Sequence, residues 1–152
     1  AYGRDYVSLR FANVYGERQG DGGEGGVISI FAKRIAEGKG ITSFGDGNQT
    51  RDFVYAGDIA DGILDALRTE AANTAYNLSI SGETSLKELV AILSKVSGKE
   101  IVPAYDKPRE GDIYRSSLNN AKAKCNLHWE PKISLEEGLR RTYEDFAKRE
   151  GK

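Results

Sequence analysis

Two short stretches decide the fold of this chain: LRFANVYG at residues 9–16 and DGNQTRDFV at residues 46–54. The first is typical of a strand that runs into a polar turn, and the second of a tight turn followed by another strand. They place Asn13 and Arg51 at strand ends, where α/β proteins keep their ligand contacts. We therefore expect an α/β protein in which these two polar residues contact a ligand.

Strand and helix patterns alternate along the rest of the chain. The expected helices cover residues 27–36, 58–68, 85–97, 118–125 and 135–148, and the expected strands cover residues 5–11, 41–44, 52–55, 75–80 and 101–105. Apolar residues recur at helical spacing in the longer helices. Thr84 is expected to cap the third helix, and Ser134 with Glu137 is expected to form a capping box at the last one.

The composition is that of an ordinary soluble domain. The 152 residues make one domain of normal size, and 22 basic residues balance 23 acidic ones to a formal net charge of −1. This balance argues against nucleic acid or an anionic membrane as the main partner, since both favour a basic patch. No apolar run approaches the roughly 20 residues that cross a bilayer, and no secretory signal is visible.

Cysteine and methionine usage adds two expectations. The single Cys125 excludes an internal disulfide and suits a reducing cytoplasm. The chain has no methionine and opens almost directly on a strand pattern, which suits a piece of a longer protein.

A glycine-rich loop at residues 20–26 satisfies the G-x-G-x-x-G pattern and is followed by a helix. The loop does not follow its strand directly, and Asp21 and Glu24 would repel a pyrophosphate bound within it. The acidic residue that should end a second strand about 20 residues further on is also missing. We therefore interpret this segment as a mobile surface loop and not as a dinucleotide site.

The two stretches quoted first resemble the extended short-chain dehydrogenase/reductase family, and within it the sugar-nucleotide 4-epimerases of the UDP-glucose type. KPREGD at residues 107–112 is similar to the family's Pro-Arg-Pro-Gly-Asp, and WEPKISLEEGL at residues 129–139 resembles a frequent ending of such enzymes. The resemblance implies that residues 1–152 are a single C-terminal, nucleotide-sugar-binding domain. The N-terminal Rossmann half would be absent, although some strand and helix pieces of this chain would complete it.

The resemblance also implies a set of polar contacts to a UDP-sugar. Arg51 and Arg109 would hold the diphosphate, Asn13 would donate an amide hydrogen bond to it, and Asp112 would accept from the ribose. Two alternatives stay open from the residues alone: Arg51 could form a surface ion pair with Asp52, and Asn13 could simply cap a turn.

The remaining implied contacts surround the base and the sugar. Phe44, with Thr42 and Ser43, would line the uracil pocket, although Phe44 could equally be a core residue. Gly26 and Val27 would offer backbone groups to the nucleotide sugar.

No catalytic residue is expected in this chain. Short-chain dehydrogenases use Tyr-x-x-x-Lys, and none of the eight tyrosines has a lysine four positions later. His128 beside Trp129 is expected to be a packed turn residue. One histidine and one cysteine cannot build a zinc site of usual composition, so no metal site is expected. A reactive pair of Cys125 and His128 stays open, but no orienting partner is visible.

The resemblance implies a UDP-glucose/UDP-galactose 4-epimerase, an isomerase of carbohydrate metabolism that transiently oxidises C4 with NAD. The backbone around Phe11 would contact the nicotinamide end of NAD in the full-length enzyme, whereas no cofactor is expected on this chain alone, which should be inactive. The alternatives are part of a sugar-nucleotide 4,6-dehydratase or decarboxylase, and a non-catalytic binding module. The expected partners are the UDP-sugar, the missing Rossmann half, and further copies of this chain, through a surface made by residues 6–11 and 59–67.

Overall fold

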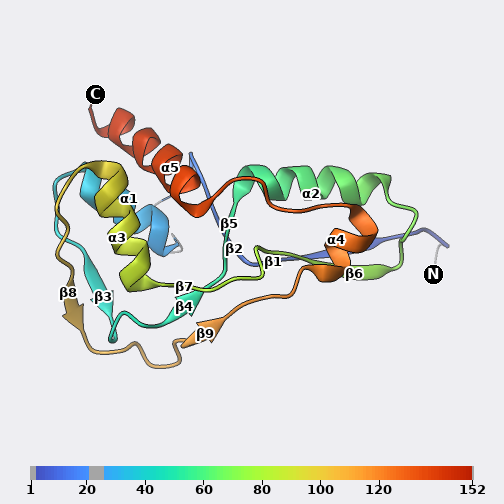
Figure 1. The fold of residues 1–152 in the computed structure, drawn as a ribbon, viewed down its shortest axis with the longest axis horizontal. Coiled ribbons are helices and arrows are strands. Elements are labelled where there is room, and N and C mark those ends of the chain that lie inside the picture. Colours follow the sequence, from blue (N-terminus) through green and yellow to red (C-terminus); the bar gives the residue numbers. More distant parts are fainter. Residues whose placement is uncertain (1–2, 21–25, 152) are drawn as a thin grey trace.

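The computed structural model of the chain describes residues 3–20 and 26–151, which form an elongated α/β molecule (Figure 1). The helices are α1 (Val27–Ala36), α2 (Ala56–Arg68), α3 (Leu86–Ser97), α4 (Ala121–Leu127) and α5 (Leu135–Glu150). The strands are β1 (Val7–Phe11), β2 (Asn13–Tyr15), β3 (Thr42–Phe44), β4 (Thr50–Arg51), β5 (Phe53–Tyr55), β6 (Thr74–Leu78), β7 (Thr84–Ser85), β8 (Ala104–Asp106) and β9 (Arg115–Ser116). The α/β class is thereby confirmed.

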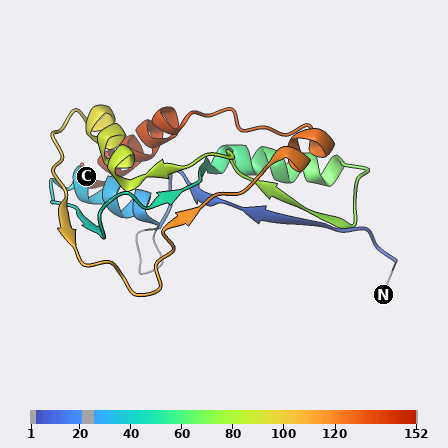
Figure 2. The ribbon, with the colours of Figure 1, turned by 60° about the horizontal axis from the view of Figure 1, so that its bottom comes forward.

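The strands form small and mostly parallel sheets. β1 pairs in parallel with β6, β2 with β5, and β3 with β8, while β4 lies between antiparallel β7 and parallel β9. Figure 2 shows β1 and β6 running side by side at the end of the molecule that holds the N-terminus. Parallel pairs need long crossover connections, and the intervening helices supply them.

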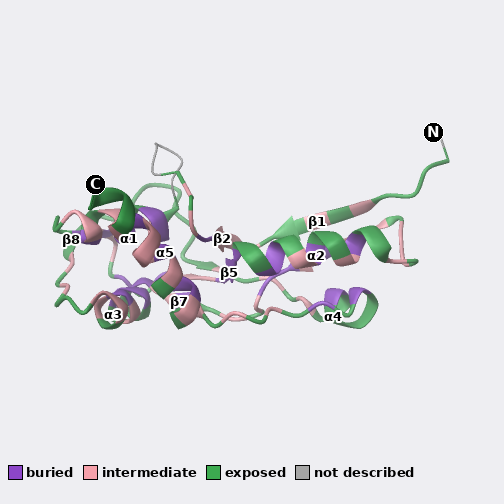
Figure 3. Ribbon diagram, turned by 90° about the horizontal axis from the view of Figure 1, so that it is seen from above, coloured by how far each residue is buried: buried purple, intermediate pink, exposed green. Residues whose placement is uncertain are grey.

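Two apolar clusters stabilise the two ends of the molecule. At one end α1, α3 and α5 pack around buried residues that include Phe31, Leu89 and Leu139. At the other end α2 and α4 pack on β6 around Tyr76 and Trp129. Figure 3 shows α2 beside β1 with a largely exposed surface, because much of their apolar area has no cover among the described residues.

Two buried carboxylates connect segments that are distant in sequence. Asp52 is 1% exposed and accepts hydrogen bonds from the backbone N–H groups of Ile80 at 2.9 Å and Leu118 at 3.4 Å. Asp58, in the first turn of α2, accepts from the N–H groups of Lys132 and Ile133, both at 3.1 Å. Hydrogen bonds to a charged acceptor are the stronger kind, so these two side chains fix the chain path around β5 and α2.

Several local expectations require correction. Residues 13–15, expected as a polar turn, form β2, because pairing with β5 supplies their backbone hydrogen bonds. Ser85 and not Thr84 caps α3: Ser85 Oγ accepts from Glu88 N at 3.2 Å, and the Glu88 carboxylate accepts from Ser85 N at 2.7 Å. Ser134 caps α5 through Glu137 N at 3.3 Å. The expected capping box forms only in this half, because the Glu137 carboxylate accepts from Arg140 and Arg141 instead. Within the described ranges no helix is both long and apolar enough to span a bilayer.

Candidate functional site

A hollow of about 250 Å³ brings together most of the predicted site residues. The predicted residues that line it are Asn13, Val27, Thr42, Ser43, Phe44, Arg51, Arg109 and Asp112. Four further lining residues were not singled out from the sequence, namely Ile30, Phe31, Gln49 and Leu86. Apolar spacing indicated a helix core for Phe31 and Leu86, because an apolar ligand wall and a helix core have the same sequence pattern.

The pairing of β2 with β5 brings the two fold-deciding stretches together. Asn13 opens β2 opposite Phe53, and its backbone N–H donates to the carbonyl of Asp52 at 2.8 Å. Arg51 ends the neighbouring strand β4, one residue before Asp52. The predicted closeness of Asn13 and Arg51 therefore follows from a backbone hydrogen bond between their segments.

The turn between β3 and β4 is held by its own side chains. The Asp46 carboxylate accepts from Asn48 N and Asn48 Nδ2, both at 2.9 Å, and these bonds hold the pKa of Asp46 below its usual value. Gly45 and Gly47 have φ angles of +84° and +76°, which side chains rarely tolerate. The buried Gln49 side chain donates through Nε2 to the carbonyl of Phe44. The turn thus presents Phe44 and Arg51 in a fixed arrangement.

Arg51 pairs with Asp112 and not with its neighbour Asp52. Arg51 Nη2 lies 2.7 Å from Asp112 Oδ1, and Arg51 Nη1 donates to the carbonyl of Thr50 at 2.8 Å. The Asp52 side chain points instead toward Ile80, so the alternative of a local surface pair is wrong. The Arg51 side chain is 18% exposed, against 37% for Asp112. The pair is therefore partly shielded and opens into the hollow.

Arg109 stacks on Phe44. The guanidinium carbon of Arg109 lies 4.0 Å from the centroid of the Phe44 ring, a typical cation–π distance. Both residues also line a second hollow of about 270 Å³, together with Pro108, Ile113 and Tyr114. Phe44, Gln49, Arg109 and Asp112 line both hollows and form their common wall.

Hydrogen bonds and an ion pair of Glu83 support β4 next to Arg51. The Glu83 carboxylate accepts from Thr50 Oγ1 at 2.6 Å and from Arg115 Nη2 at 2.8 Å. These hydrogen bonds, led by those from Arg115, lower the pKa of Glu83 to about 2. Glu83 thus remains charged at neutral pH and ties β4 to β9.

Two predicted residues lie beside the hollow and do not line it. Gly26 precedes α1, and its carbonyl accepts from Ile30 N at 3.1 Å and Ser29 Oγ at 2.8 Å. Phe11 ends β1 and is 45% exposed. The expectation of a mobile glycine loop falls on residues 21–25, which lie outside the described residues.

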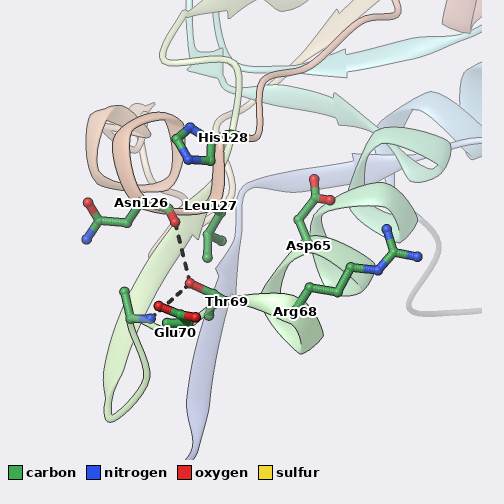
Figure 4. A pocket seen from close by; sticks show the side chains of 8 residues that line it. Asp65, Arg68, Thr69, Glu70, Asn126, Leu127 and His128 are labelled. Carbon is green, nitrogen blue, oxygen red and sulfur yellow. Dashed lines mark hydrogen bonds between the residues drawn. The ribbon is translucent and has the colours of Figure 1, made fainter.

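A separate hollow of about 440 Å³ lies between α2 and α4, at the opposite end of the molecule from β3 (Figure 1). Thr69 Oγ1 donates there to the carbonyl of Asn126 at 3.4 Å, and Arg68 extends away from it (Figure 4). His128 is exposed in this region with a φ of 54°, so the expected packed turn residue is an exposed helix C-cap. The walls carry charges of both signs and none of the predicted site residues, so this hollow is not the candidate site.

No group of histidine, cysteine, aspartate or glutamate side chains among residues 3–20 and 26–151 is arranged to hold a metal ion. The candidate site is built from two arginines, a carboxylate, an amide and an aromatic ring. Such a set suits an anionic ligand that also carries hydroxyl groups and a flat ring.

Comparisons with known proteins agree with this chemistry. The sequence pattern of the NAD dependent epimerase/dehydratase family matches residues 1–79. Over 145 residues the chain is 37% identical to a UDP-glucose 4-epimerase of Mycolicibacterium smegmatis. The aligned region covers 95% of this chain and 46% of the relative. Over 140 residues it is 33% identical to UDP-glucuronic acid decarboxylase 1 of Arabidopsis thaliana. This alignment covers 92% of this chain and 32% of the relative.

The fold comparison gives the same result. The crystal structure of a UDP-glucose 4-epimerase with UDP-glucose from Thermotoga maritima matches with a TM-score of 0.93 and 42% identity. The match covers 97% of this chain and 48% of that structure. The chain therefore spans about half the length of the epimerases that it matches.

Proposed function

The chain belongs to the NAD dependent epimerase/dehydratase family, and we propose that in its full-length protein it binds the UDP-sugar substrate of a 4-epimerase. One observation carries this proposal. Arg51, Arg109, Asp112 and Phe44 come from three separate segments and converge on one hollow. Their chemistry matches the parts of a nucleoside diphosphate: two phosphates, a ribose and a base.

Each group has a distinct role in this proposal. Arg51 and Arg109 hold the diphosphate through charge-assisted hydrogen bonds, and the side-chain amide of Asn13 donates a further one. The ring of Phe44 offers a flat apolar face to the uracil, with Thr42 and Ser43 of the same strand nearby. Asp112 accepts hydrogen bonds from the ribose hydroxyls.

The sugar end of the ligand faces α1. Gly26 and Val27 begin this helix, where backbone N–H groups are still free of intrahelical partners. We infer that these groups contact the sugar part of the substrate.

NAD, when bound to the full-length protein, supplies the transient oxidation of the sugar at C4. Phe11, at the carboxyl end of β1, is exposed and lies outside the hollow. We assign Phe11 the backbone contact to the nicotinamide end. The chain's own part in catalysis is to grip and orient the UDP-sugar.

The N-terminal half of the family's fold is the partner that completes the site. We propose that residues 1–152 act as one nucleotide-sugar-binding domain, whose β1 and α2 also extend the sheet and the helix layer of that half. Tyr6, Leu64 and Leu67 support this proposal, since they are 60%, 49% and 78% exposed on these elements or next to them.

A decarboxylase is the second candidate function. The 33% identity to a UDP-glucuronic acid decarboxylase supports a shared mode of UDP binding, which both classes of enzyme need. A non-catalytic binding module would use the same hollow without turnover. The three candidates therefore differ in the reaction and not in the ligand chemistry of this chain.

The deciding experiment assays the purified full-length protein with NAD. We expect conversion of UDP-galactose to UDP-glucose in a coupled assay, and no release of carbon dioxide from UDP-glucuronic acid. Carbon dioxide release without epimerisation would favour the decarboxylase, and UDP binding without either reaction would favour the binding module. Residues 1–152 alone should show no turnover with added NAD.

A further inference from the structure

The charged pair of Arg51 and Asp112 occupies the place proposed for the ligand's diphosphate and ribose. The two side chains lie 2.7 Å apart and both line the 250 Å³ hollow. Asp112 also lines the neighbouring 270 Å³ hollow, whereas Arg51 lines only the first. The carboxylate therefore stands at the boundary between the two hollows, beside the guanidinium that faces the first.

A ligand of nucleotide-sugar size that fills both hollows lies across this boundary. Ligand pockets typically measure about 300–1,000 Å³, and each hollow alone is smaller than that. Together the two hollows are large enough. The ribose joins the base to the diphosphate, so the boundary is where its hydroxyls lie when the ligand spans both hollows.

An anion that reaches Arg51 meets the Asp112 carboxylate at close range. The pair is only partly exposed, so solvent screens the repulsion between the anion and the carboxylate incompletely. A ligand with ribose hydroxyls can donate hydrogen bonds to Asp112. These bonds compensate the Asp112 carboxylate for the contact that it loses with Arg51. Free pyrophosphate has no such donors. It must displace the Asp112 carboxylate from Arg51 without offering that carboxylate a hydrogen bond in return.

We propose that Asp112 makes the site selective for nucleoside diphosphates over phosphates that lack a ribose, by competing with them for Arg51. The inference rests on the proposed function, because it assumes that Arg51 binds the diphosphate. It adds that the ribose contact and the phosphate contact are coupled through one ion pair.

The test compares UDP with pyrophosphate in calorimetric titrations of the full-length protein at constant ionic strength. Asp112→Asn removes the charge and keeps the shape. Glu110→Gln removes the same charge from an exposed position of the same loop and serves as the matched control. Asp112→Ser provides a second variant, and thermal unfolding checks that each protein is folded.

We expect Asp112→Asn and Asp112→Ser to bind pyrophosphate about fivefold more tightly than the wild type, the equivalent of about 1 kcal/mol for a partly exposed charge pair. UDP should gain less, because its ribose hydroxyls then meet a neutral acceptor in Asp112→Asn and a shorter side chain in Asp112→Ser. The preference for UDP over pyrophosphate should therefore fall, toward about fivefold if UDP gains nothing. Glu110→Gln should change pyrophosphate binding less than about twofold.

Three results would overturn the inference. If UDP binds the wild type but Asp112→Asn leaves pyrophosphate affinity unchanged, the competition does not exist, while the proposed function stands. If Glu110→Gln strengthens pyrophosphate binding equally, the effect is one of overall charge. If the wild type binds neither ligand, the proposed function itself fails together with this inference.

Discussion

The guanidinium of Arg109 lies over the ring of Phe44, with its central carbon 4.0 Å from the ring centroid. Arg109 is otherwise exposed, and Phe44 comes from β3, 65 residues earlier in the chain. The stack thus attaches the loop of residues 107–112 to the β3–β4 turn. It also leaves the proposed phosphate-binding cation and the proposed base platform in direct contact.

This stack leads to a prediction for Phe44→Leu, which keeps an apolar side chain and removes the ring. Affinity for UDP should fall by about 0.5–1.5 kcal/mol, the usual contribution of an aromatic contact beyond its buried area. Affinity for pyrophosphate should change little, since that ligand has no base. Calorimetry with both ligands measures the difference, and an equal loss for both would mean that Phe44 only supports the loop.

Arg51→Ala should weaken UDP binding by about 1.5–3 kcal/mol, the scale of a charged hydrogen bond. Arg51→Lys should recover only part of this, because an ammonium lacks the planar fork of a guanidinium. Arg140→Ala is a suitable control, since Arg140 pairs with Glu137 and Glu144 on α5 and lines neither hollow. If Arg51→Ala leaves the UDP affinity unchanged, Arg51 forms only a surface ion pair and does not bind the ligand.

Local patterns predicted the longer helices well. α1 was expected over residues 27–36 and forms there, because its apolar spacing and Gly38, at a φ of +70°, define both the helix and its end. β4, β7 and β9 have two residues each and no periodic signal. Their pairing partners lie far away in the sequence, so only the folded chain could reveal them.

The candidate site shows the same limit. Asn13 and Arg51 were selected from their place at strand ends and Asp112 through the family resemblance, and the roles of all three stay predictions. The pairing of Arg51 with Asp112 joins residues 61 positions apart, and no spacing rule connects them. Gln49 was overlooked because a buried glutamine side chain has no distinctive sequence context. Sequence patterns report local geometry, whereas this site depends on contacts between distant loops.

Acid sensitivity should depend on Glu83. Its pKa in the folded chain is about 2, below the ordinary value of 4.5, so the carboxylate stabilises the fold fully above about pH 4.5. That stabilisation is lost as the pH falls from about 4.5 to 2. The melting temperatures of the wild type and Glu83→Gln should therefore differ at pH 7, and the difference should shrink below about pH 4.5 and vanish near pH 2. A constant difference at both pH values would show that the Glu83 charge does not matter.

Gly138→Ala should destabilise the chain, although alanine usually favours a helix by about 1 kcal/mol. A Cβ at Gly138 would lie 2.9 Å from Cζ of the buried Tyr15 and closer still to its hydroxyl. Overpacking of this kind costs about 1–3 kcal/mol. Adding Tyr15→Phe removes the closest atom, so the double variant should lose less stability than the two single losses added together. Denaturant unfolding of all four proteins measures this coupling.

The isolated chain should self-associate through the β1–α2 face, defined here as Tyr6, Ile63, Leu64 and Leu67. These side chains are 60%, 40%, 49% and 78% exposed, and large exposed apolar patches are typical of contact surfaces. Among the described strands β1 pairs only with β6, so its other edge is open to a further strand. Both features favour the pairing of two copies.

Sedimentation velocity over a range of concentrations tests this expectation. Combining Leu64→Lys with Leu67→Glu keeps the net charge and should shift residues 1–152 toward the monomer, because both changes place a charge in the contact. Val102→Glu is the control: Val102 is 79% exposed and lies outside the β1–α2 face, so its change should leave association intact. If the N-terminal half covers this face as proposed, the same double change should instead lower the stability of the full-length protein. A wild-type chain that stays monomeric at high concentration would contradict the prediction.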